Sequence, residues 1–87
     1  MSNELLPWTD DAWSDYLYWQ TQDKKTLKRI TTLIADVKRS PFEGIGISEP
    51  LKEHLSGFWS RRIDDANKLV YTVDERAITM ISCRYYY

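Results

Sequence analysis

The spacing of the apolar residues changes once along this chain, from a helical period to a period of two, and this change constrains the fold most strongly. Between Asp10 and Val37 the apolar positions recur every three or four residues, whereas after Leu55 they alternate. A run of helices followed by a run of strands is typical of the α+β class. We therefore predict one domain over residues 1–87, with a two-helix hairpin packed on a twisted antiparallel β-sheet.

The first predicted helix runs from Asp10 to about Gln20, with Thr9 or Asp10 as its N-cap. Its apolar residues fall at helical spacing and are expected to face the core; they are Ala12, Trp13, Tyr16, Leu17 and Trp19. Before this helix, residues 4–8 fit an edge strand, because proline is tolerated at the edge of a sheet.

Asp23 is expected to cap a second helix, which ends at Ser40-Pro41. The short break between the helices predicts an antiparallel hairpin. Basic residues crowd the first two turns of the second helix, where the helix dipole disfavours cations; they are Lys24, Lys25, Lys28 and Arg29. A solvated polar face and contact with an RNA backbone are the two interpretations of this cluster, and both remain open.

Residues 41–50 contain two of the three glycines and two of the three prolines, so this segment is predicted to be a loop. Three strands are expected after it, over Phe58–Ile63, over Lys68–Val73, and from Ala77 to Tyr85 or beyond. Each pair is joined by a polar turn, which favours an antiparallel meander.

Residues 49–71 hold the densest combination of a carboxylate, cations and strand-forming residues in the chain. The candidate site residues are Glu49 and Lys52 on the loop, Arg61 and Arg62 at the end of a strand, and Lys68 at the start of the next strand. A carboxylate beside several cations can bind a phosphate and transfer a proton next to it, which favours an RNA-directed protein. Ordinary ion pairs on a hairpin are the competing interpretation.

The strand register decides whether two of these cations meet. If the first turn spans five residues, from Ile63 to Asn67, Arg62 lies across from Lys68 on one face of the sheet. If the turn spans four residues, Arg62 pairs with Leu69 and the two cations separate. Both registers are compatible with the sequence.

The charge distribution and the cysteine and histidine content limit the kinds of protein and site that this chain can form. The net charge is −1, but residues 1–23 contain five acids and no lysine or arginine, and all twelve basic residues follow. One cysteine, Cys83, and one histidine, His54, exclude a disulfide framework and a Cys/His metal site. Cys83 is expected to be a buried, unreactive thiol, and His54 an exposed polar residue. Because no apolar run has membrane-spanning length and no signal peptide is recognisable, we expect a cytoplasmic protein.

The chain ends in Arg84 followed by three tyrosines, Tyr85, Tyr86 and Tyr87. Three aromatic rings are unusual at an exposed terminus. Packing in the core or in a dimer is one explanation, and stacking on RNA bases is the other.

Several segments, in order, resemble the YoeB toxins of bacterial toxin–antitoxin modules, within the RelE-type superfamily: WSDYLYWQ, RSPFEGIG, EPLKEHLSGFWSRRI, KLVYTV and CRYYY. The resemblance covers nearly the whole chain from about Trp8. It implies a microbial-RNase-like α+β fold and an endoribonuclease that cuts messenger RNA in the ribosomal A site. It also implies a cognate YefM-like antitoxin that covers the active surface, a homodimer, and contact with operator DNA only through the antitoxin complex. No cofactor, metal or membrane is implied.

The resemblance also assigns roles to residues. The family's carboxylate base corresponds to Glu49, its phosphate-binding cations to Lys52 and Arg62 with Arg61 nearby, and its terminal tyrosine to Tyr87.

The chain departs from the family pattern at two positions. Lys68 replaces the usual arginine, which keeps the charge but loses bidentate geometry. Tyr86 replaces the usual histidine, and a phenol, with a pKa near ~10, releases its proton less readily than an imidazolium. Some distant RelE-type relatives use tyrosine and lysine in this role, so activity is compatible with Tyr86. The alternative is a catalytically weakened homologue that acts mainly as an antitoxin- or ribosome-binding protein.

Overall fold

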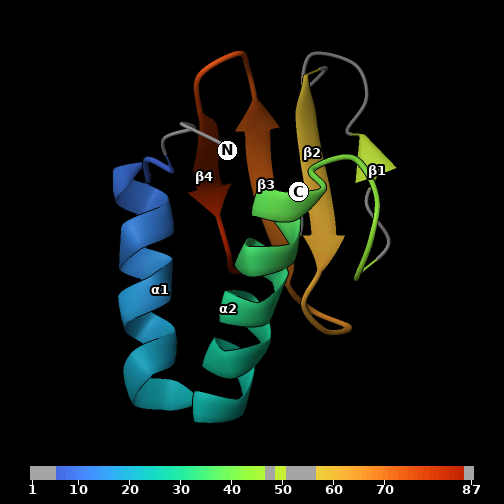
Figure 1. Ribbon diagram of the computed structural model, residues 1–87. Coiled ribbons are helices and arrows are strands. Elements are labelled where there is room, and N and C mark those ends of the chain that lie inside the picture. Colours follow the sequence, from blue (N-terminus) through green and yellow to red (C-terminus); the bar gives the residue numbers. More distant parts are fainter. Residues whose placement is uncertain (1–5, 47–48, 51–56, 86–87) are drawn as a thin grey trace.

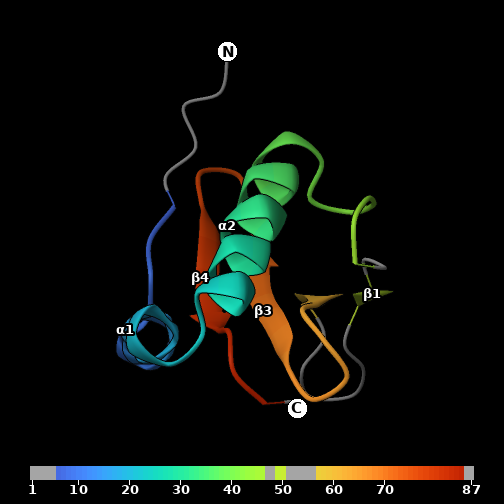
Figure 2. The same ribbon diagram turned by 90° about the horizontal axis from the view of Figure 1, so that it is seen from below.

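A computed structural model describes residues 6–46, 49–50 and 57–85. Its elements are the helices α1 (Asp10–Gln22) and α2 (Lys24–Arg39) and the strands β1 (Glu49–Pro50), β2 (Phe58–Arg62), β3 (Lys68–Val73) and β4 (Ile78–Ser82). The strands form one antiparallel sheet in the order β1-β2-β3-β4. Figure 1 shows the two helices as a hairpin, and Figure 2 shows α2 lying over one face of the sheet with α1 near β4. The predicted α+β class and architecture are confirmed.

Both predicted helix starts are confirmed by their caps. The Thr9 hydroxyl accepts a hydrogen bond from the Ala12 amide at 3.1 Å. The Asp23 carboxylate accepts bonds from the amides of Lys25 at 3.0 Å and Thr26 at 3.3 Å. Each cap satisfies amide groups that have no partner within the helix. Neither helix among the described residues has the length and apolar character of a membrane-spanning segment.

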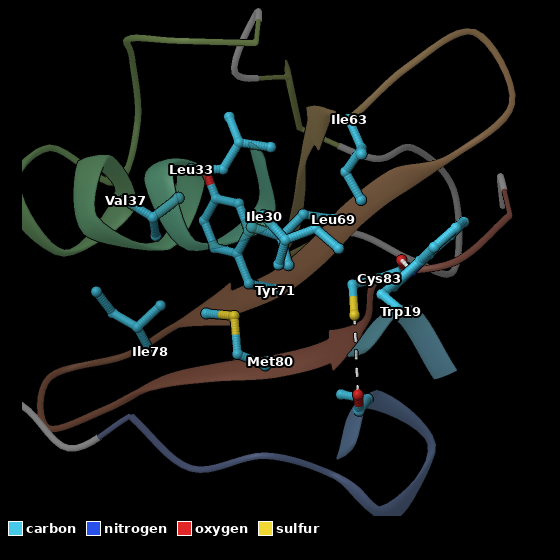
Figure 3. Packing of buried hydrophobic residues seen from close by; sticks show 11 residues of the cluster. Trp19, Ile30, Leu33, Val37, Ile63, Leu69, Tyr71, Ile78, Met80 and Cys83 are labelled. Carbon is cyan, nitrogen blue, oxygen red and sulfur yellow. Dashed lines mark hydrogen bonds between the residues drawn. The ribbon is translucent and has the colours of Figure 1, made fainter. Parts of the chain in front are cut away.

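The main core lies between α2 and the strands β3 and β4. Ile30, Leu33 and Val37 recur at three- and four-residue spacing, so they share one face of α2, and all three are fully buried. They belong to one buried cluster with four residues of the sheet, which are Leu69, Tyr71, Ile78 and Met80 (Figure 3). The face of the sheet that carries Leu69 and Tyr71 therefore turns toward α2.

The predicted core stripe of α1 is too wide. Ala12 and Trp19 are buried, but the side chains of Trp13 and Leu17 are 48% and 43% exposed. Ala12 and Trp19 are seven residues apart and so lie on one side of the helix, whereas Trp13 and Leu17 lie on the next side. The ring of Trp13 packs edge-on against that of Trp8 instead, with centroids 5.9 Å apart.

The prediction of an edge strand over residues 4–8 is wrong for residues 6–8, the part of this segment that the structure describes. Only Trp8 makes a bridge, and it is a parallel one to Met80. The backbone bonds around it run from the Met80 amide to the Pro7 carbonyl at 2.9 Å and from the Thr9 amide to the Met80 carbonyl at 3.0 Å. The pairing with β4 stops after one bridge, because Thr9 is the N-cap of α1 and the chain continues from there as a helix.

The last strand is shorter than predicted, because β4 ends at Ser82 and the chain bends at Cys83. The Cys83 thiol is buried, as predicted, and contacts the Ala12 carbonyl at 3.8 Å (Figure 3). Burial, with a smaller contribution from the Asp15 charge, raises the pKa of this thiol to about 12. The thiolate required for reactivity is therefore disfavoured.

Candidate functional site

Strands β2 and β3 are paired so that Arg62 lies directly across from Lys68. The turn between them has five residues and is closed by bonds from the amides of Ile63 and Asp64 to the Asn67 carbonyl, at 3.0 and 3.2 Å. The five-residue register is therefore the correct one of the two alternatives. It places two cationic residues at neighbouring positions at one end of the sheet.

Glu49 and Pro50 form a short edge strand, so the prediction that residues 41–50 are entirely loop is wrong at its end. Glu49 is the cross-strand partner of Ser60, and Pro50 of Trp59. Gly46 holds the loop before this strand against β2, because its carbonyl accepts a hydrogen bond from the Arg62 amide at 2.7 Å. Positive φ at Gly46, +80°, allows this close approach.

Alternation along β2 separates two sets of residues. Arg61 is paired with Leu69, on the face that turns toward α2. Ser60 and Arg62 belong to the opposite face, since side chains alternate along a strand. Register positions 49, 60, 62 and 68 therefore share the face of the sheet that α2 does not cover.

Arg62 reaches solvent on this face, with 51% of its side chain exposed, and Lys68 is half-buried. Arg62 lies 3.9 Å from the carboxylate of Asp65, which is itself fully exposed. An exposed pair at this distance is weak. A phosphate, which a guanidinium can bind through two parallel hydrogen bonds, would be a stronger partner than this exposed carboxylate.

The end of the chain also reaches this corner. The Lys68 amide donates a hydrogen bond to the Tyr85 carbonyl at 3.0 Å. The Tyr85 ring is 61% exposed, so it does not pack in the core of the chain. The segment that leads into the two last tyrosines is therefore fastened beside the Arg62–Lys68 pair.

Four predicted residues lie outside the described part of the chain, namely Lys52, His54, Tyr86 and Tyr87. Their roles remain predictions, as does the role of the Glu49 carboxylate. Within residues 6–46, 49–50 and 57–85, no group of three or more His, Cys, Asp or Glu side chains could hold a metal ion.

Arg61 is not at the surface, contrary to the prediction that it binds substrate. Its side chain is fully buried, and its five N–H groups are all used. The acceptors are Tyr71 Oη at 3.1 Å, Asp36 Oδ2 at 2.7 Å, and the carbonyls of Ile45 at 2.8 Å, Ser40 at 2.6 Å and Glu43 at 3.0 Å. A guanidinium satisfied in this way fastens the 40–46 loop to the sheet and has no donor left for a ligand.

Asp36 is the counter-charge of Arg61 and was missed by the sequence prediction. It also accepts hydrogen bonds from the Arg39 guanidinium and, at 3.0 Å, from the Ile45 amide. Gly44 passes so close that an added Cβ would lie 2.2 Å from Asp36 Oδ2. The available signal was an acid placed three residues after Leu33 and directly before Val37, within the apolar stripe of α2.

Hydrogen bonds from Arg61 and from the Ile45 amide lower the pKa of Asp36 to about 2. Because the folded-state pKa lies below the ordinary value of 3.8, the ionised carboxylate stabilises the fold above about pH 4. This contribution is lost as the pH falls toward about 2. We expect the stability difference between the natural chain and Asp36→Asn to shrink over that range, measured by urea unfolding at several pH values. A difference that stays constant with pH would contradict the assignment.

Comparison with known proteins identifies the family. Residues 8–87 match the model of the YoeB-like toxin of bacterial type II toxin–antitoxin system. The chain is 52% identical over 82 residues to Toxin YoeB of Escherichia coli (strain K12), covering 94% of this chain and 98% of that protein. The structure resembles the YoeB dimer from Staphylococcus aureus, with a TM-score of 0.90, 41% identity, and coverage of 99% and 100%. It also resembles the heterotetrameric YoeB–YefM toxin–antitoxin complex from Staphylococcus aureus, with a TM-score of 0.87, 41% identity and the same coverage. The fold, the identities and the near-complete coverage together show that this chain belongs to the YoeB-like toxins of bacterial type II toxin–antitoxin systems.

Proposed function

We propose that this chain is a ribosome-dependent endoribonuclease that cuts messenger RNA in the A site and so stops translation. One observation carries the proposal. The strand registers bring position 49, Arg62 and Lys68 to the face of the sheet that α2 does not cover, and the Lys68 amide holds the Tyr85 carbonyl beside them. These residues are distant in sequence, and the pairing of their strands brings position 49 near two cationic residues and the backbone of Tyr85.

The proposed reaction is attack of a ribose 2′-hydroxyl on the adjacent phosphorus. Glu49 accepts the hydroxyl proton as general base. The P–O5′ bond breaks as the new P–O2′ bond forms, and the Tyr86 phenol gives its proton to the leaving 5′-oxygen, with Tyr87 next to it. The products are a 2′,3′-cyclic phosphate and a 5′-hydroxyl. The residues that stabilise the charge of the phosphorane are Lys52, Arg62 and Lys68.

The surface next to this site also suits an RNA partner. Lys24, Lys25 and Lys28 are exposed at the start of α2. Arg29 joins this surface to the site, because its guanidinium donates a hydrogen bond to the Arg62 carbonyl at 3.1 Å. A row of cations that continues from the site can follow a nucleic-acid backbone, which favours RNA contact over a merely solvated face.

We also propose the remaining partners and the compartment. The YoeB–YefM complex of the Staphylococcus aureus relative supports a YefM-like antitoxin for this chain. The YoeB dimer of the same organism supports a homodimer. Operator DNA is reached only through the antitoxin complex. Because the substrate is message on the ribosome, the proposed compartment is the cytoplasm.

A translation extract tests this function. Added to the extract, the chain should convert a reporter message into 3′-truncated fragments that end at A-site codons. The same message without ribosomes should stay intact. If translated message also stays intact, or if free RNA is cut equally well, the proposed ribosome-dependent activity is wrong.

The second candidate is a weakened toxin that binds its antitoxin or the ribosome but hardly cleaves. The observation that favours it is the pair of departures from the family pattern, Tyr86 for histidine and Lys68 for arginine. A Tyr86→His variant separates the two candidates. If the natural chain lacks an effective general acid, this change should raise cleavage by about 10²–10⁴-fold, measured as truncated message per unit time. A natural chain that already cleaves rapidly and gains little from Tyr86→His excludes the second candidate.

A further inference from the structure

The first residue after β4 is tied to α1 by both of its backbone polar groups. The Cys83 amide donates to the Asp15 carboxylate at 3.0 Å, and the Cys83 carbonyl accepts from the Trp19 indole at 2.8 Å. The next residue, Arg84, places its guanidinium 3.5 Å from the centroid of the Tyr18 ring. Contacts with α1 therefore fix the direction in which the backbone leaves β4.

Tyr85 is held from the other side, by the turn between β2 and β3. Its amide donates to Oδ1 of Asn67 at 2.7 Å, and its carbonyl accepts from the Lys68 amide at 3.0 Å. Among the described residues, Tyr85 is the only non-glycine residue with positive φ, at 66°. This left-handed conformation is unfavourable for a large L side chain. The ring is largely exposed and lies beside the Arg84 guanidinium, 4.6 Å from its centroid, so the bonds to Asn67 and Lys68 are the contacts that hold the Tyr85 backbone in this conformation.

The side chain of Asn67 is itself fixed in orientation. It is 8% exposed, and its Nδ2 donates to the Asp64 carboxylate, at 3.0 Å to one oxygen and 3.3 Å to the other. Reversing the amide would set Oδ1 against that carboxylate, so Oδ1 is directed to the Tyr85 amide. The orientation of this acceptor is therefore set by Asp64 and does not depend on Tyr85.

We infer that Asn67 is a positioning residue for the C-terminal tyrosine pair. By holding Tyr85 in the left-handed conformation, it keeps the Tyr85 carbonyl on the Lys68 amide. Tyr86, the predicted general acid, is the next residue along the chain. This inference rests on the proposed function, because it assigns Asn67 to the same reaction without placing it in contact with substrate.

An Asn67→Ala variant tests the inference. We expect kcat for cleavage of message on ribosomes to fall about 10–100-fold, because a misplaced acid lowers the rate of the chemical step. KM for the programmed ribosomes should change little, because Arg62 and Lys68 remain. The matched control is Asp74→Ala, whose carboxylate caps the β3–β4 turn by accepting from the amides of Arg76 and Ala77. This control removes a comparable turn contact far from the site and should leave kcat unchanged.

A second change separates positioning from general loss of stability. Glycine adopts positive φ without strain, so Asn67→Ala/Tyr85→Gly should recover part of the lost kcat. Its thermal midpoint should stay at or below that of Asn67→Ala, because the glycine removes a side chain and loosens the unfolded chain. Recovery of rate without recovery of stability is the signature of a conformational role.

The outcomes separate this inference from the proposed function. If the natural chain cleaves but Asn67→Ala keeps its kcat, or if Tyr85→Gly restores nothing, the positioning role is overturned and the function stands. If neither the natural chain nor Tyr86→His cleaves message on ribosomes, the function fails and the inference fails with it.

Discussion

A Glu49→Gln variant is expected to cleave message on ribosomes about 10²–10⁴-fold more slowly than the natural chain, because the amide cannot accept the 2′-hydroxyl proton. The side chains are nearly the same size, and Glu49 lies on a two-residue edge strand at the margin of the sheet. Unfolding midpoints should therefore stay close together, so a loss of activity reports chemistry. The measurement is the initial rate of fragment formation from a single programmed codon.

Glu75→Gln is the matched control for this variant. Glu75 is exposed in the β3–β4 turn, at the opposite end of β3 from Lys68. The same loss of a carboxylate at that position should leave cleavage unchanged. If Glu49→Gln and Glu75→Gln cleave alike, Glu49 is not the base.

The second large effect is on stability. Arg61→Met is expected to lower the free energy of unfolding by about 3–5 kcal/mol, because it removes the buried cation that pairs with the Asp36 carboxylate and leaves only the exposed Arg39 as a charged partner among the described residues. In a domain of this size, that corresponds to a fall in the thermal midpoint on the order of 12–40 °C. The carbonyls of Ser40, Glu43 and Ile45 lose their donor as well. Thermal unfolding followed by circular dichroism measures the change.

Arg62→Met is the matched control, because Arg62 is the next residue along β2 and its side chain is half exposed. Its ion pair with Asp65 is long, at 3.9 Å, and exposed, so losing it should cost little stability. We expect the thermal midpoint of Arg62→Met to change little and its cleavage rate to fall. Arg61→Met should instead lose mainly stability. Equal stability losses in the two variants would contradict the assignment of Arg61 to the interior and Arg62 to the site.

The sequence predicted the fold through local signals. Apolar spacing located both helices, and Thr9, Asp23 and Ser40-Pro41 marked their ends. The switch to a period of two located the meander. These features depend on residues close together in the chain, so they follow from local backbone chemistry.

The misplaced residues depended on the tertiary structure. Arg61 and Arg62 are adjacent in sequence and identical in type, yet one is buried and the other is at the surface. The phase of β2 decides between them, and this phase is set by pairing Arg61 with Leu69 on the face that packs on α2. The stripe of α1 was too wide for a similar reason, since which side faces β4 depends on where the helix docks. The sequence gives no sign of the contact between Asn67 and Tyr85, because these residues meet only in the folded chain.

We propose that this chain cuts ribosome-bound message by attack of a 2′-hydroxyl, on a surface that includes Glu49, Arg62 and Lys68. The most direct test uses purified ribosomes programmed with a message that carries a single 2′-deoxynucleotide at the mapped cut position, beside an all-ribose control. We expect the control to be cut to a fragment ending in a 2′,3′-cyclic phosphate and the 2′-deoxy message to stay intact at that position. Equal cutting of both messages, or a fragment that ends in a 3′-hydroxyl, would contradict the account.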